Sequence, residues 1–72
     1  MAARPPAFTV SGPGVDRCYP SGGVALSAAI TYAARAWAEV TYYVRTPSGE
    51  PYGYAEADED GNVFVRRHGP AR

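Results

Sequence analysis

The chain contains no lysine, and all seven of its basic residues are arginines. Seven acidic residues balance them, so the formal net charge is zero. A general polyanion-binding protein gains affinity from an excess of positive charge, through counterion release, so this balance argues against one. Arginine without lysine, together with abundant alanine, glycine and proline, is typical of GC-rich coding sequences and suggests an actinobacterial or phage origin.

Cysteine and histidine are scarce, with one residue of each type, Cys18 and His68. A single cysteine allows no internal disulfide, and the sequence has no Cys/His cluster that would hold a stabilising metal. It also lacks any run of 18 consecutive apolar residues, and residues 1–6 lack the apolar stretch of a signal peptide. We therefore expect a cytoplasmic protein without a cofactor, a metal or a membrane partner.

The length of 72 residues, of which 46% are hydrophobic, is enough for one small domain spanning 1–72. A chain of this length buries only about 60% of its unfolded surface, and a single core rarely supplies more than about 3 to 5 kcal/mol. We therefore expect association, most simply as a homodimer. Residues 1–7 and 68–72 show no hydrophobic periodicity, and we expect them to be disordered.

Three β-strands are predicted in the second half of the chain. Residues 39–45 are rich in β-branched and aromatic side chains, residues 52–57 alternate large and small side chains, and residues 63–67 form a third apolar run. Glycine-containing turns at 46–50 and 58–62 join the three strands. This pattern predicts a three-stranded antiparallel meander.

One α-helix is predicted before the meander, over residues 21–38, with Ser21 as its N-cap. Its core-facing stripe recurs at helical spacing and consists of Leu26, Ile30, Ala33 and Trp37. Residues 8–11 can form a short strand, followed by a loop at 15–20. If that strand joins the sheet, the helix becomes a crossover to a parallel strand. The predicted fold class is therefore α+β, with a short N-terminal strand, one helix and a three-stranded meander packed on that helix.

The register predicted for the meander gives the sheet two apolar faces. Three-residue turns at 47–49 and 59–61 place the small side chains of the middle strand on one face, together with Tyr43. An alanine-rich helix can pack closely on that face. The opposite face then carries aromatic side chains bordered by arginines, and we expect the interaction surface to consist of Tyr42, Tyr52, Tyr54, Phe64, Arg45 and Arg66.

This aromatic face is large for a surface exposed to water. One aromatic side chain buries about 150 to 250 Å², so four of them exceed the roughly 300 to 600 Å² of a monomer's largest apolar patch. Tyrosine and arginine are enriched in binding hot spots, so the face predicts a protein partner or a second copy of the chain. The alternative is a single-stranded nucleic acid whose bases stack on the rings while the arginines contact phosphates. A different register, or a face that its hydroxyls and charges keep stable in water, would require no partner.

Catalytic and metal sites are poorly supported by the sequence. Residues 58–62 resemble the start of a calcium loop, but Gly61 stands at the fourth position of that loop rather than the sixth. Cys18 and His68 have no third residue in their sequence context that would orient a nucleophile and a base. We expect a small non-enzymatic interaction module, an accessory or regulatory protein of a phage or actinobacterium that acts as a homodimer or binds a host protein.

Overall fold

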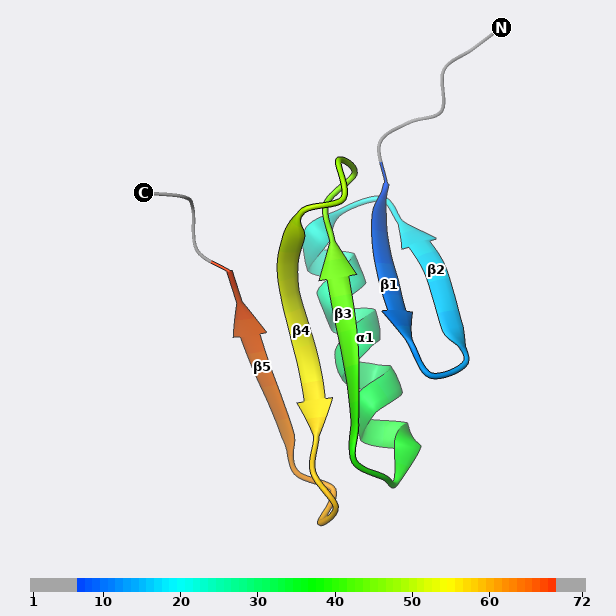
Figure 1. Cartoon of the computed structure of the whole chain (residues 1–72), viewed down its shortest axis with the longest axis vertical. Coiled ribbons are helices and arrows are strands. Elements are labelled where there is room, and N and C mark those ends of the chain that lie inside the picture. Colours follow the sequence, from blue (N-terminus) through cyan, green and yellow to red (C-terminus); the bar gives the residue numbers. More distant parts are fainter. Residues whose placement is uncertain (1–6, 69–72) are drawn as a thin grey trace, which may run out of the picture.

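The computed structural model describes residues 7–68 and contains one helix and one five-stranded sheet (Figure 1). The elements in chain order are β1 (Phe8–Gly12), β2 (Val15–Tyr19), α1 (Gly22–Ala36), β3 (Val40–Arg45), β4 (Pro51–Ala57) and β5 (Val63–Arg67). Every neighbouring pair of strands is antiparallel, and the strand order is β2-β1-β3-β4-β5. The α+β class is confirmed, with one more strand than predicted.

The additional strand, β2, lies in the segment predicted to be a loop. Pro13 and Gly14 form a tight turn in which Gly14 has a φ of 72°. A proline followed by a glycine with positive φ is typical of a type II turn, which reverses the chain and lets β2 pair with β1. The prediction of a parallel crossover is wrong, because β1 pairs antiparallel with β3.

The helix begins at the predicted N-cap, where the Val24 amide donates to the Ser21 hydroxyl at 3.2 Å. Its buried face is confirmed at Leu26 and Ala33, and Trp37 is the exception. The helix ends at Ala36, and Trp37 then adopts a left-handed φ of 54°. Its side chain leaves the stripe and is 86% exposed. Within residues 7–68, no helix has the length and hydropathy needed to cross a membrane.

The core lies between α1 and the sheet and is built largely from small side chains. Among residues 7–68, only Val10 and Val44 are both fully buried and larger than alanine, and Tyr42 is the largest side chain in the core, at 6% exposed. The Tyr42 ring fits over Gly12, where a Cβ would stand 2.2 Å from its Cδ1 atom. The buried residues are Val10, Ala25, Leu26, Ala29, Ala33, Tyr42, Val44, Ala55 and Ala57.

A hydrogen bond between two tyrosines joins the β1–β2 hairpin to the helix. The hydroxyl oxygens of Tyr19, on β2, and Tyr32, on α1, lie 2.9 Å apart. This hydrogen bond is the main reason that the pKa of Tyr19 is raised above its ordinary value, and burial adds to the effect. The outer hairpin is therefore fixed to the helix as well as to β3.

The predicted register between β4 and β5 is confirmed residue by residue. Ala55 lies opposite Val65, Ala57 opposite Val63, and Glu56 opposite Phe64. The turn between the two strands closes through Asp58, whose carboxylate accepts from the backbone amides of residues 60 and 62 at 2.9 Å each. These hydrogen bonds, and one from the Asn62 side chain that has the largest effect, lower the pKa of Asp58. They favour a hairpin turn over a cation loop.

A β-bulge in β4 changes the register between β3 and β4 from the predicted one. The turn itself follows the prediction, since Gly49 has a φ of 91° and Arg45 pairs with Pro51. The next pair is Val44 with Gly53, which leaves Tyr52 as an extra residue. One extra residue shifts the pairing by one, so the side chains of β3 meet the opposite faces of β4 from those expected.

Candidate interaction surface on the open sheet face

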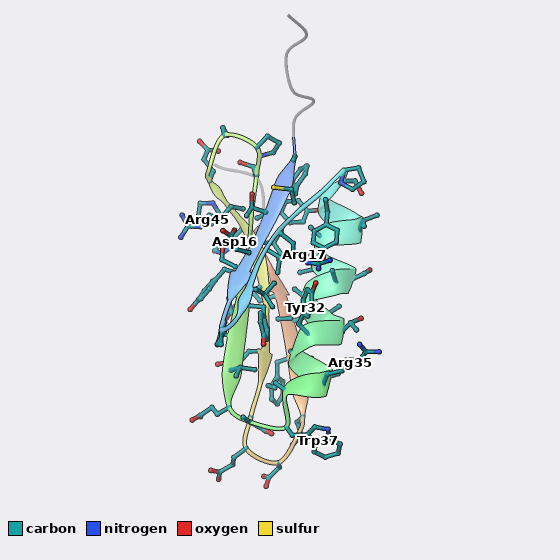
Figure 2. The ribbon with its side chains drawn as sticks, turned by 90° about the vertical axis from the view of Figure 1, so that its right-hand side faces the viewer. Asp16, Arg17, Tyr32, Arg35, Trp37 and Arg45 are labelled. Carbon is teal, nitrogen blue, oxygen red and sulfur yellow. The ribbon has the colours of Figure 1, made fainter. Side chains whose placement is uncertain are left out.

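The sheet has one face that α1 covers and one face that no helix of the described residues covers (Figure 2). We call the second the open face. Figure 2 shows Asp16 and Arg45 on this side of the sheet, and Arg17, Tyr32 and Arg35 on the side of the helix. Strand pairing extends this assignment to the residues in register with them. The open face consists of Thr9, Ser11, Asp16, Cys18, Thr41, Tyr43, Arg45, Tyr54, Glu56, Phe64 and Arg66.

Tyr43 and Tyr54 form the aromatic centre of the open face. They lie opposite each other on β3 and β4, with ring centroids 5.9 Å apart and an angle of 54° between the ring planes. Tyr43 is 52% exposed, and Phe64 on β5 is 55% exposed. Cross-strand aromatic contacts hold rings in fixed positions, so this part of the face offers a preformed apolar surface.

The charges of the open face are balanced and lie around the aromatic centre. Asp16 is on the edge strand β2, Arg66 is on the edge strand β5, Arg45 is at the end of β3, and Glu56 is near the end of β4. Two acidic and two basic side chains share one face, as is common at the polar rim of a protein interface. A site for a polyanion would instead favour basic residues alone.

The bulge leaves a hollow on this face. Tyr52 turns toward the helix, where it packs against Gly22, and Gly53 pairs with the buried Val44. Neither residue places a side chain on the open face, so the main chain of β3 and β4 lies uncovered there. The hollow has a volume of about 250 Å³, below the roughly 300 to 1,000 Å³ of small-molecule sites. It is sized for one side chain of a partner. Its lining residues are Tyr43, Val44, Arg45, Pro51, Gly53 and His68.

Four of the six residues predicted for the interaction surface lie on the open face, namely Tyr54, Phe64, Arg45 and Arg66. The predicted positions of Tyr42 and Tyr52 are wrong. Tyr42 is buried beneath α1, where its ring centroid lies 5.6 Å from that of Tyr32.

Tyr52 is turned inward by the bulge and packs against Gly22 and against Phe8, whose ring centroid is 5.2 Å away. Arg67 stands over its other side, with the guanidinium carbon 5.7 Å from the ring centroid. Tyr52 therefore closes the end of the core near the start of the helix, and is not available as an exposed anchor.

The predicted interaction surface lacks Tyr43 and Asp16, which lie at the aromatic centre and at one edge of the open face. The predicted pairing of β3 with β4 differs by one residue from the observed pairing and places Tyr43 on the helix face. Gly53 is the sequence feature that indicates the bulge, since an isolated glycine within a strand often marks one. The prediction of a loop at 15–20 gives Asp16 no face, whereas β2 places it on the open face.

Comparison with known proteins gives no match. No protein-family model, no curated protein and no solved structure shows significant similarity to this chain. The function is therefore inferred from the side chains themselves.

Among residues 7–68, no three histidine, cysteine, aspartate or glutamate side chains gather where they could hold a metal ion. Cys18 is exposed on the open face, on the edge strand β2. His68 follows β5, and its amide donates to the Tyr52 carbonyl at 2.9 Å. The open face therefore offers rings, charges and a hollow of side-chain size, which are the features of a binding surface.

Proposed function

We propose that this chain is a small non-enzymatic protein-binding module and that the open face is its binding surface. The observation that carries the proposal is the pair of neighbouring rings, Tyr43 and Tyr54, at the centre of an uncovered sheet face with Phe64 beside them. Rigid aromatic side chains at the centre of a patch, with charges at its rim, are the arrangement from which binding hot spots are made. An accessory or regulatory role fits a chain of this size and surface.

The test compares one substitution on the open face with one on the helix. Tyr43→Thr removes an exposed ring from the open face, whereas Val24→Thr makes an apolar side chain of similar exposure, 48%, polar on the surface of α1. Sedimentation and crosslinking should show that Tyr43→Thr weakens association, with itself or with a captured protein, at least tenfold. Val24→Thr should leave it within about twofold, since peripheral side chains contribute little. Equal effects of the two variants would argue against the open face.

Single-stranded nucleic acid is the second candidate ligand, favoured by Arg45 and Arg66 on the same face as the exposed rings. Bases stack on such rings, and arginines contact phosphates. Anisotropy of a labelled oligonucleotide at low and moderate salt tests this candidate, because its affinity should fall steeply with ionic strength. Asp16 and Glu56 on the same face oppose a polyanion, so we place it second.

A further inference from the structure

The central row of the open face carries opposite charges at its two ends. Strand pairing aligns five side chains across the whole sheet, from one edge strand to the other. The row begins with an acid on β2, passes through two tyrosines, and ends with a base on β5. β3 is the middle strand of the five, so each charged end lies two strands from it. In order, the row is Asp16, Ser11, Tyr43, Tyr54 and Arg66.

These two charges are too far apart to pair within one copy of the chain. Four strand spacings separate β2 from β5. At about 4.8 Å per spacing, the distance across the sheet is about 19 Å. Any ion pair between Asp16 and Arg66 must therefore join two molecules.

A two-fold axis satisfies both charges at once. When two open faces stack and the axis runs parallel to β3 between them, β2 of one copy lies over β5 of the other. Asp16 then faces Arg66 of the second copy, and the same pair forms again at the opposite edge. Tyr43 meets Tyr43 of the second copy on the axis. Stacked sheets lie about 10 Å apart, a gap that a long arginine and a short aspartate can bridge together.

We propose that the open face binds a second copy of this chain in a two-fold dimer in which Asp16 of each copy pairs with Arg66 of the other. This inference rests on the proposed function, because it assigns a partner to the same surface. The row is complementary to itself, whereas an unrelated protein would have to supply its own matching row. An isologous interface requires such self-complementarity.

The small area of the face indicates a weak dimer. A sheet about 19 Å wide and about 17 Å long offers roughly 300 to 400 Å² per copy. Stable complexes bury about 800 Å² per partner, and weak transient ones bury less. We therefore expect a weak and reversible dimer. One contact opposes it, because the axis also brings the two Arg45 side chains near each other at the end of β3, and like charges across an interface lower affinity.

Charge reversal tests the arrangement directly by sedimentation equilibrium at low salt. Asp16→Arg and Arg66→Asp each place like charges at both edges, so each variant alone should dimerise at least tenfold more weakly than the parent chain. An equimolar mixture of the two variants should form a heterodimer, because each then meets its opposite, and the double variant should recover the affinity of the parent. Arg17→Asp is the matched control, since it makes the same change in net charge as Arg66→Asp on the helix side of β2, and it should leave the affinity unchanged. Arg45→Gln should strengthen the dimer.

The outcomes separate this inference from the proposed function. A parent chain that stays monomeric at high concentration overturns the self-pairing and leaves the open face to a different protein. A dimer weakened by Tyr43→Thr but not by either charge reversal uses the open face in another arrangement, which also overturns the pairing. A dimer that none of these variants weakens forms elsewhere on the molecule and counts against both proposals.

Discussion

The neighbouring residues Tyr42 and Tyr43 offer the strongest test of the two sheet faces. Tyr42 is 6% exposed beneath the helix, and Tyr43 is 52% exposed on the open face. An aromatic side chain buries about 150 to 250 Å². Each Å² of apolar surface removed from water contributes about 25 cal/mol to the free energy of folding. The covered part of Tyr42 therefore contributes about 4 to 6 kcal/mol, and that of Tyr43 about 2 to 3 kcal/mol, both as upper estimates.

Replacing each tyrosine in turn with threonine, which strands tolerate well, should separate the two positions. We expect Tyr42→Thr to cost about 3 to 5 kcal/mol, which is as much as a core of this size supplies, so that little folded protein remains. Tyr43→Thr should cost about 1 to 2 kcal/mol, because about half of the ring is already in water.

Far-UV circular dichroism in water detects the loss of folded protein expected for Tyr42→Thr, and urea denaturation followed by the same signal measures the smaller loss of stability in Tyr43→Thr. Dilute samples keep the chain monomeric, so that association does not add to the measured stability. Equal losses, or a larger loss at Tyr43, would refute the bulge register and the open face that follows from it.

Three further substitutions test local features of the fold. Gly23→Ala should stabilise the helix by about 0.5 to 1 kcal/mol, since no atom lies within 4 Å of the new Cβ. Gly22→Ala should destabilise the protein, because the new Cβ would stand 2.4 Å from the ring of Tyr52. Urea denaturation ranks the stabilities of the two variants. Trp37→Gly should raise the free energy of unfolding by about 1 kcal/mol, because glycine adopts a left-handed backbone without strain. A lower melting temperature would contradict this reasoning. Tyr32→Phe should lower the raised pKa of Tyr19 toward its ordinary value, as measured by tyrosinate absorbance. In the parent chain that raised pKa stabilises the fold below about pH 10, and the contribution is lost as the pH rises through the folded-state pKa.

Local sequence signals predict the elements whose structure depends on their own residues alone. The serine before the helix, the glycine turns and the alternating residues of β4 and β5 each identify their own structure without reference to the rest of the chain. The face of Tyr43 depends on one extra residue in another strand, and no local preference of β3 encodes it. Trp37 fits the helical spacing of its stripe, yet the helix stops one residue earlier, because the chain must turn there to enter β3.

The bulge links the stability of this small fold to the surface that it presents. Without the extra residue, Tyr42 and Tyr52 would both face water, and the core would keep mainly alanines, valines and Tyr43. With it, those two rings lie beneath the helix, where the fully buried side chains larger than alanine in the described part of the chain are two valines. Tyr43 is then turned outward beside Tyr54. The aromatic centre of the open face is thus a consequence of how the core is filled, and in the proposed dimer the charges at the two ends of the central row select a second copy of the chain.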